Sequence, residues 1–432
     1  MKEGFTRRRF LRGVGGAIGA PWLFPAIIPA RALGLGGATA PSGRITVGMI
    51  GAGSHGVAVN LKGMLAQEDV RVVAVCDVDL PRARGAKQLV DAKYGNGDCA
   101  AGQDFRGILA RADIDAVVIS TPDHWHVPIS VMALRAGKDV LCEKPTLTIA
   151  QGRALVDVVR RTGRVFQTAT EDRSVGVYHR MAELVRNGRI GKLQTIRVTL
   201  PGAPPERRGN PAPMPVPPEL DYDLWLGPAP WAPYTEDRVH YNFRWIQDYS
   251  GGILADWGMH MFDTAQWAND TDRGGPIRVG ATGRFYDDGL YDTLCEFRIE
   301  YTYANGVRLI AESGGTGLRF EGADGWVGNA GWRKPLEASS ESILRSVIGP
   351  EETHLFTCPA GEHRNFIDCV KSRREPYFPA EIGHRVATVC HIGNISALLG
   401  RPLRWDPDAE CFPDDPEANR HISRPMRAPW RI

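Results

Sequence analysis

The chain has 432 residues, of which 43% are hydrophobic and 24% are charged, and its formal net charge is +2. That length can bury a sizeable core and is enough for two domains. The near-neutral balance argues against nucleic acid or an anionic membrane as a partner. Eight cysteines without a C-x-x-C pair indicate neither a zinc site nor a redox pair.

The first residues have the pattern of an export signal. Arg7 and Arg8 stand in a basic run, a moderately apolar stretch covers residues 13–28, and Ala30-Arg31-Ala32 matches an A-x-A cleavage site. We predict a twin-arginine signal peptide over residues 1–34 and therefore an exported, periplasmic protein that meets the twin-arginine machinery. An uncleaved basic amphipathic start is the alternative. No later segment reaches the length of a membrane span.

A glycine-rich turn follows the first apolar run. Residues 45–50 lead into Gly51, Gly53 and Gly56, the spacing G-x-G-x-x-G, and apolar residues at helical spacing resume after it. The first glycine permits a tight turn, the second lets the backbone approach a pyrophosphate, and the third lets helix and strand pack closely. The pattern predicts a strand, turn and helix that bind a dinucleotide at the helix N-terminus.

A second apolar run, residues 70–75, leads to Asp77. A carboxylate at this position accepts hydrogen bonds from the adenosine ribose and repels the 2′-phosphate of NADP. NAD is therefore the expected cofactor. Arg82 and Arg84 keep NADP open as the alternative, because an arginine can accept that phosphate.

Strand and helix patterns alternate up to about residue 168. This alternation predicts a doubly wound parallel sheet, in a dinucleotide-binding domain over residues 35–170. Ligands of such sheets lie beyond the carboxyl ends of the strands. The predicted strands are 115–120, 140–142 and 165–168, and the predicted helices are 129–136 and 149–162.

Two strand ends carry unusual residues. Residues 121–126, Thr-Pro-Asp-His-Trp-His, are expected to form a loop along the nicotinamide ribose, and Glu143-Lys144-Pro145 combines an acid and a base at a turn. His124 and His126 with Asp123 would be a possible metal site. Zinc needs three or four ligands, and no further partner stands at a fixed spacing, so we predict no metal.

The second region, residues 171–432, has a different character. Residues 201–233 contain 11 prolines, too many for regular structure, and we expect a long ordered loop or lid. A disordered linker is the alternative. Hydrophobic alternation on both sides of Asn305-Gly306 predicts a hairpin with a type I′ turn in an open sheet with one polar face. A last helix is expected over residues 382–399.

Between these segments, a helical stretch follows Gly251-Gly252. Asp256 and His260 are four residues apart on it and therefore project from one side. Arg244-Trp245, just before this stretch, and Arg173 are candidates for contacts with sugar hydroxyls, with ordinary surface positions as the alternative.

The glycine pattern, Glu143-Lys144-Pro145 and the Asp256-x-x-x-His260 spacing together resemble the Gfo/Idh/MocA family of nicotinamide-dependent sugar and cyclitol oxidoreductases. The resemblance runs from about residue 44 to the C-terminus. It implies a Rossmann domain followed by an α+β domain with a large open, mostly antiparallel sheet, in a homodimer or homotetramer. The implied cofactor-binding residues are Gly51, Ala52, Gly53, Ser54, His55, Gly56, Asp77, Thr121, Pro122, His126, Glu143, Lys144 and Gln167.

The resemblance also implies that Lys144, Asp256 and His260 form the catalytic group. Oxidising a secondary alcohol requires a base for the hydroxyl proton. Lys144 can serve if burial and the cationic nicotinamide lower its pKa, and His260 is the rival because its ordinary pKa is near neutral. Asp256 would orient the hydroxyl or the imidazole.

The expected function is NAD-dependent hydride transfer between a tightly bound nicotinamide and a secondary alcohol of a sugar, sugar derivative or cyclitol. Because exported proteins meet no appreciable pool of free NAD, each catalytic cycle must restore the cofactor. Two closed cycles remain open: oxidation of one sugar with reduction of another, or an NAD-dependent glycosidase or lyase that oxidises C3 transiently and eliminates the C1 group. A non-catalytic sugar-binding protein is the third reading, and the three catalytic-type residues argue against it.

Overall fold

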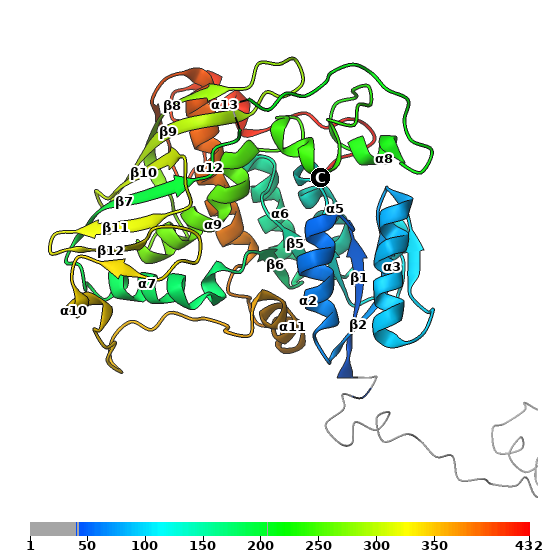
Figure 1. The fold of residues 1–432 in the computed structure, drawn as a ribbon, viewed down its shortest axis with the longest axis horizontal. Helices are drawn as coiled ribbons and strands as arrows, with labels where there is room; N and C mark the ends of the chain where they lie inside the picture. Colours follow the sequence, from blue (N-terminus) through cyan, green and yellow to red (C-terminus); the bar gives the residue numbers. More distant parts are fainter. Residues whose placement is uncertain (1–39, 41–42, 205) are drawn as a thin grey trace, which may run out of the picture. The chain divides into compact units, whose positions relative to one another are not determined.

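A computed structural model describes residues 40, 43–204 and 206–432, and the predicted signal peptide lies outside them. Within the described residues the chain forms two sheets, one of six strands and one of eight, with helices between and around them (Figure 1). None of the described helices combines the length and the apolar character that crossing a membrane requires.

The first sheet is parallel throughout and has the strand order β3-β2-β1-β4-β5-β6. Its inner strands are apolar on both faces; β4 is Ala-Val-Val-Ile and fully buried, as a strand covered on both sides must be. The prediction of a doubly wound parallel sheet is confirmed. Its strands are β1 (Ile45–Ile50), β2 (Val70–Cys76), β3 (Ala100–Gly102), β4 (Ala116–Ile119), β5 (Asp139–Glu143) and β6 (Phe166–Ala169).

The helices of this layer begin where the strands end. The segment after the glycine-rich turn is a π-helix, η3 (Gly56–Leu61), that continues as α2 (Lys62–Leu65). The others are α3 (Leu80–Tyr94), α4 (Arg106–Leu109), α5 (Asp123–Arg135) and α6 (Ile149–Thr162).

The start of α5 corrects the sequence interpretation. Residues 123–126 form its first turn, not a loop. Pro122 is the N-cap in an extended conformation, and an acidic residue such as Asp123 is favourable at the positive end of the helix dipole. The apolar periodicity after Pro128 suggested a later start. A proline is nevertheless accommodated inside this helix at that position.

The second sheet has the order β13-β12-β11-β7-β10-β9-β8-β14, in which only the β7–β10 pair is parallel. Burial alternates along β9, so one face is packed and the other is polar, as predicted. Its strands are β7 (Leu193–Leu200), β8 (Pro276–Phe285), β9 (Leu294–Tyr303), β10 (Arg308–Ser313), β11 (Leu318–Gly322), β12 (Trp326–Asn329), β13 (Glu337–Ala338) and β14 (Leu403–Arg404).

The hairpin between β9 and β10 is present, but its turn is not type I′. That type needs a positive φ at both central residues, and Gly306 has φ +85° whereas Asn305 is not in that region. Gly306 N donates to Tyr303 O, and Tyr303 N donates to Val307 O. The loop is therefore one residue longer than the two-residue loop of a type I′ hairpin, and its last residue, Gly306, has a positive φ.

Helices α9 (Gly252–Ala268) and α12 (Ala380–Leu399) lie between the two sheets, and α12 contacts both α6 and α9 (Figure 1). Helix α7 (Gly176–Arg186) contacts α9 and β12. The chain then crosses between layers once more: Phe366 and Ile367 of α11 (Glu362–Ser372) are fully buried in the same core cluster as Val47 and Met49 of β1. The C-terminal region thus completes the core of the first layer.

Contrary to the expectation of no regular structure, the described part of the proline-rich segment contains α8 (Tyr222–Leu226), whose apolar side chains are buried. The remaining short elements are η4 (Asp172–Ser174), η5 (His240–Trp245), α10 (Glu341–Leu344), α13 (Pro416–Asn419) and η6 (Arg420–Ile422).

Candidate active site

A cavity of about 550 Å³ opens at the carboxyl ends of β1, β2, β4 and β5. Residues of both layers line it, from the glycine-rich turn on one side to α9 and η5 on the other. This is the position at which open parallel sheets bind ligands.

The glycine-rich turn has the geometry that a dinucleotide requires. Gly51 has φ +91°, and a Cβ there would lie 2.5 Å from the main chain of Ser120. A Cβ on Gly56 would lie 2.7 Å from Gly51 O, whereas at Gly53 the nearest atom is a guanidinium nitrogen at 3.5 Å. Gly51 and Gly56 therefore allow close packing, and Gly53 leaves the backbone open to a pyrophosphate.

Asp77 lies at the end of β2 and lines the cavity. Its carboxylate accepts hydrogen bonds from Ala52 N at 2.6 Å and Asp79 N at 2.9 Å, which fixes its position, and burial raises its pKa. The arrangement suits ribose hydroxyls and disfavours a phosphate. Of the two nearby arginines, Arg82 lines the cavity and pairs with Asp79 at 3.3 Å, whereas Arg84 is exposed.

The histidines at the start of α5 bind main-chain oxygens. His126 Nδ1 lies 2.8 Å from Pro145 O and Nε2 lies 2.8 Å from Thr121 O, so this ring joins the ends of β4 and β5. His124 Nε2 lies 2.9 Å from Trp225 O, and burial lowers the pKa of His124 to about 4. His124 therefore has a structural role, whereas His126 also lines the cavity.

Glu143 anchors the helix that follows the glycine turn. Its Oε1 lies 2.9 Å from His55 Nε2 and accepts a hydrogen bond from Asn60 Nδ2 at 2.8 Å. Burial opposes its charge, but these partners and Lys144 hold its pKa at about 2. Asn60 also donates to Ser120 Oγ at 2.9 Å, so this buried amide, which no sequence motif marked, connects the ends of β4 and β5.

Lys144 forms an ion pair with Asp256. Its Nζ lies 2.7 Å from Asp256 Oδ1 and 2.8 Å from Asp256 O, and its side chain is 10% exposed. Burial favours the neutral amine, but the charges of Asp256 and Glu143 outweigh burial and raise the pKa of Lys144. The protein's own residues thus shift this pKa opposite to the lowering expected from the sequence.

Asp256 stands between two cations. Arg244, on η5, places Nε 3.3 Å from Asp256 Oδ2, while Lys144 occupies the other oxygen. Burial opposes the carboxylate, yet the two cations lower the Asp256 pKa well below its usual range. Lys144, Asp256 and Arg244 all line the cavity. Arg244 is therefore placed where it could contact a sugar, and it does not occupy an ordinary surface position.

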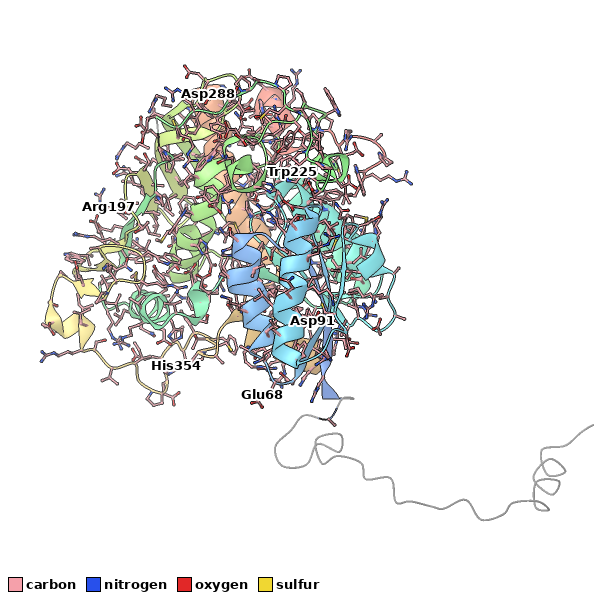
Figure 2. All side chains as sticks on the ribbon, turned by 45° about the vertical axis from the view of Figure 1, so that its right-hand side comes forward. Glu68, Asp91, Arg197, Trp225, Asp288 and His354 are labelled. Carbon is pink, nitrogen blue, oxygen red and sulfur yellow. The ribbon has the colours of Figure 1, made fainter. Side chains whose placement is uncertain are left out.

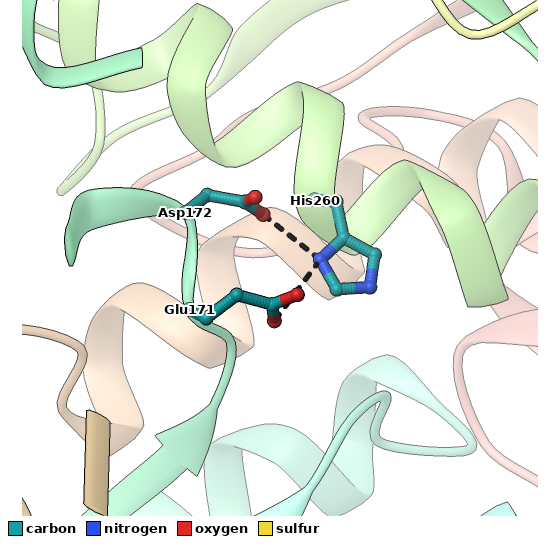
Figure 3. A group of neighbouring side chains, drawn as sticks. All are labelled: Glu171, Asp172 and His260. Carbon is teal, nitrogen blue, oxygen red and sulfur yellow. Dashed lines mark hydrogen bonds and ion pairs between the residues drawn. The ribbon is translucent and has the colours of Figure 1, made fainter. Parts of the chain in front are cut away.

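His260 lies one helical turn after Asp256 on α9 and also lines the cavity. Its Nδ1 is 2.8 Å from Asp172 Oδ2 and 4.0 Å from Glu171 Oε2 (Figure 3). When the Asp172 carboxyl is ionised, Nδ1–H donates this hydrogen bond and Nε2 is the nitrogen that can accept a proton. Trp332 packs edge-on against the imidazole, with ring centroids 5.0 Å apart.

Asp172 and Glu171 were not identified from the sequence, because they lie 88 residues before His260 or more and belong to no motif. Their carboxylates and the imidazole have donor atoms within 4.8 Å of one another, a spacing at which a cation can bind. The short His260–Asp172 hydrogen bond already accounts for their arrangement.

Several predicted contacts lie away from the cavity wall. Gln167 is fully buried and donates to Glu362 O at 3.0 Å, and Ala52 contributes its N–H to Asp77. The expectation that Arg173 contacts a sugar is wrong. Its buried guanidinium donates hydrogen bonds to the Asp263 carboxylate and a further one to Asp272, so its role is structural. The cavity lining includes the other predicted residues: Gly51, Gly53, Ser54, His55, Gly56, Asp77, Thr121, Pro122, His126, Glu143, Lys144, Asp256 and His260.

The family model "Oxidoreductase family, NAD-binding Rossmann fold" matches residues 45–170, and "Oxidoreductase family, C-terminal alpha/beta domain" matches residues 207–432. Both models belong to the Gfo/Idh/MocA family.

Curated relatives include a D-glucoside 3-dehydrogenase of Escherichia coli, 30% identical over 227 residues, with 52% of this chain and 54% of the relative covered. An inositol 2-dehydrogenase of Rhizobium meliloti is 34% identical over 259 residues, with 58% and 63% covered. A glycosyl hydrolase family 109 protein of Saccharopolyspora erythraea is 36% identical over 128 residues, with 28% and 27% covered. In each case the chain spans less than two thirds of the relative's length.

Among solved structures, the aldose-aldose oxidoreductase of Caulobacter crescentus matches with a TM-score of 0.62 at 18% identity, covering 84% of this chain and 99% of that one. At that identity the match supports the fold alone. The family models account for both layers and more than half of the chain, and the chain therefore belongs to the Gfo/Idh/MocA oxidoreductase family.

Proposed function

We propose that this protein is an NAD-dependent oxidoreductase that transfers hydride between a tightly bound nicotinamide and a secondary alcohol of a sugar, sugar derivative or cyclitol. The observation that carries the proposal is one cavity. Lys144, Asp256 and His260 line the same space as the glycine-rich turn and Asp77.

In this proposal the chain's own residues manage the proton. A bound nicotinamide supplies the hydride acceptor, and oxidation of an alcohol then needs a base at the hydroxyl. Lys144 Nζ is the base once it has lost its proton, and it returns that proton when the carbonyl is reduced. Asp256 holds the amine in place, and His260 Nε2 is the second group able to accept a proton there.

The fit to NAD rests on this chain's geometry. Gly53 leaves open backbone for the pyrophosphate, and Asp77 is fixed where it would accept from the ribose. The proposed export requires that the cofactor be restored in every cycle, so two half-reactions on sugars complete one turnover.

The test begins with the nucleotide. Denaturing the purified protein and identifying the released nucleotide by mass spectrometry should give NAD. Mixing the NAD-loaded protein with candidate sugars and cyclitols should then produce reduced nicotinamide, followed by its absorbance. Release of NADP would overturn the role of Asp77. A protein that binds no nucleotide, or whose nucleotide no sugar or cyclitol reduces, would overturn the proposal.

A second candidate is a redox-neutral glycosidase or lyase. The similarity to a glycosyl hydrolase family 109 protein favours it, although only over 128 residues. Oxidation at C3 would acidify the C2 hydrogen, and the C1 group could then leave before the hydride returns. Release of the aglycone from a glycoside in deuterium oxide, with deuterium at C2 of the product, would favour this reaction over a dehydrogenase.

We further propose a homodimer or homotetramer, as the family resemblance implies. The polar outer face of the eight-stranded sheet offers charged cross-strand pairs, such as Arg308 with Glu300. Light scattering after size-exclusion chromatography measures the mass directly, and a monomer of the full mass would contradict this part.

A further inference from the structure

The proline-rich segment returns from the second layer to the first. We name residues 219–228 the clasp. Leu220 of the clasp pairs with Asp79 in an antiparallel bridge, and two main-chain hydrogen bonds of 2.9 and 3.1 Å flank this pair. The bridge lies just beyond the end of β2, two residues after Asp77. The clasp therefore adds main-chain pairing at the edge where the ribose would lie.

A side chain of the first layer holds the same bridge. Gln103 Nε2 donates to the carbonyl oxygens of Val78 and Glu219, both at 2.9 Å. One amide thus joins the strand end to the clasp, although Glu219 is 116 residues away in the sequence. Gln103 also lines the cavity.

The helix of the clasp, α8, docks on α5. Trp125 Nε1 donates to Leu224 O at 3.0 Å, and His124 Nε2 lies 2.9 Å from Trp225 O. A Cβ at Gly227 would lie 2.1 Å from the Trp125 ring, so only glycine permits this contact. The carbonyl groups at the end of this helix thus find their partners in the other layer.

The C-terminal tail braces the clasp from outside. Arg427 Nε donates to Gly227 O at 2.9 Å, and Nη2 donates to Asp223 O at 2.8 Å. Trp430 packs edge-on against Trp125 with ring centroids 4.6 Å apart. Figure 1 shows the C-terminus close to α8 and α5, and Figure 2 labels Trp225 in the upper part of the molecule, below Asp288.

Leu224 and Trp225 are 6% and 3% exposed, and both line the cavity that the glycine-rich turn and Asp77 also line. We infer that the clasp is a retention element for the dinucleotide: it covers the adenosine end, and the nucleotide leaves only when the clasp separates from β2 and α5. This inference rests on the proposed function. It explains how an exported enzyme keeps its cofactor while sugars enter at the nicotinamide end.

The first experiment locks the clasp. Asp79 and Leu220 form a non-hydrogen-bonded antiparallel pair, because the two flanking hydrogen bonds join their neighbours. The side chains of such a pair lie close together. An Asp79→Cys/Leu220→Cys variant should therefore form a disulfide. Release of NADH from this variant can be followed by nicotinamide fluorescence after excess NAD is added. The release should be at least about tenfold slower in the oxidised protein than in the reduced protein, because the disulfide opposes opening of the clasp. The reduced protein is the matched control.

The second experiment loosens the clasp without touching the cavity. Arg427 is not in the cavity lining, so Arg427→Ala should accelerate NADH release by about tenfold through the lost hydrogen bonds. Arg401→Ala is the control, because its guanidinium forms ion pairs with Asp415 and Glu417, neither of which belongs to the clasp.

The two proposals fail differently. Thiol titration shows whether the disulfide has formed. If it has formed, and if the oxidised variant releases NADH as fast as the reduced variant and Arg427→Ala as fast as the parent, the clasp does not retain the nucleotide. Hydride transfer to bound NAD would be unaffected by that result. If the protein takes up no nucleotide, the clasp inference and the proposed function fall together.

Discussion

Lys144 is held as an ammonium by Asp256, and this is the property on which the proposed chemistry depends. Burial alone would favour the neutral amine, but the two neighbouring carboxylates dominate and raise its pKa. The lysine is therefore ready to donate a proton when a carbonyl is reduced. Before it can accept one from an alcohol, it must first be deprotonated.

Replacing the lysine separates binding from chemistry. Lys144→Met should retain NAD but slow reduction of the bound cofactor in a single turnover with sugar by ~10²–10⁴-fold, the usual effect of losing a general base. The exposed Lys62→Met on α2 is the matched control and should react at the parental rate. Parental reduction by the Lys144→Met protein would move the base to His260.

The pH dependence identifies the titrating group. Oxidation of the alcohol should accelerate as pH rises toward the Lys144 pKa, because the reactive form is the neutral amine. Asp256→Asn removes a charge that raises this pKa, so its single-turnover rate should reach half-maximum at lower pH, although its maximum also falls. The Asp172→Asn variant alters the partner of His260 instead and should leave the midpoint in place. An unchanged midpoint in Asp256→Asn would exclude Lys144 as the group observed.

Effects within this group should not add. Lys144 and Asp256 share an ion pair, and His260 lies one turn further on the same helix. Residues that act as one unit give double variants that lose little more than the worse single variant. The Lys144→Met/Asp256→Asn protein is the informative combination.

At the scale of elements, the turn between β1 and η3 separates folding from binding. Alanine at Gly51 would combine φ +91° with a Cβ 2.5 Å from Ser120, and such backbone strain costs roughly 1–3 kcal/mol before the clash is counted. Gly53 has no such restriction within the protein. Gly51→Ala should therefore lower the melting temperature of the nucleotide-free protein.

Gly53→Ala should instead leave that melting temperature nearly unchanged and weaken NAD binding by about tenfold or more, equivalent to ~1.4 kcal/mol. Calorimetric titration of NAD into nucleotide-free protein measures the loss. Equal NAD affinity in Gly53→Ala and the parent would mean that the pyrophosphate does not approach this turn.

Local patterns predicted both sheets and several of their helices, but not which residues meet across the fold. The four-residue spacing of Asp256 and His260 predicted that both project from one side of the helix, because helical geometry is local, and both line the cavity. Asp172 was missed, since its contact with His260 depends on how η4 meets α9. Likewise, an amphipathic stretch containing Phe366 does not reveal that α11 completes the core under β1.

The expectations were wrong for two single elements. Pro128 made the apolar run after it look like the start of a helix, whereas the chain begins α5 at Asp123 with Pro122 as its cap. Eleven prolines in residues 201–233 predicted a loop without regular structure, but α8 forms within it. Only the folded chain shows that this loop spans back to β2 through Leu220 and Asp79.

At the scale of the whole molecule, the site exists only when both layers are assembled. Lys144 comes from the end of β5 in the first layer, and its partner Asp256 comes from α9 in the second. The clasp and α11 add two further crossings between the layers. A dinucleotide bound in this cavity would therefore be enclosed by residues of both layers, and not by the first layer alone.

That enclosure fits the predicted export of a folded protein. The signal lies outside the described residues, so its support is the sequence around Arg7 and Arg8. Because the translocation receptor reads the arginine pair, replacing both by lysine should keep the protein in the cytoplasm. The parental protein should appear in the periplasmic fraction.

Nucleotide analysis of both fractions completes the test. If the cofactor is bound before export, periplasmic parental protein and retained lysine variant should release NAD in the same ratio to protein on denaturation. The Arg427→Ala protein, whose clasp is loosened, should arrive in the periplasm with less NAD than the Arg401→Ala control, because nucleotide lost there is not replaced. Periplasmic appearance of the lysine variant would refute the twin-arginine assignment, and a parental protein exported without nucleotide would refute the closed cycle.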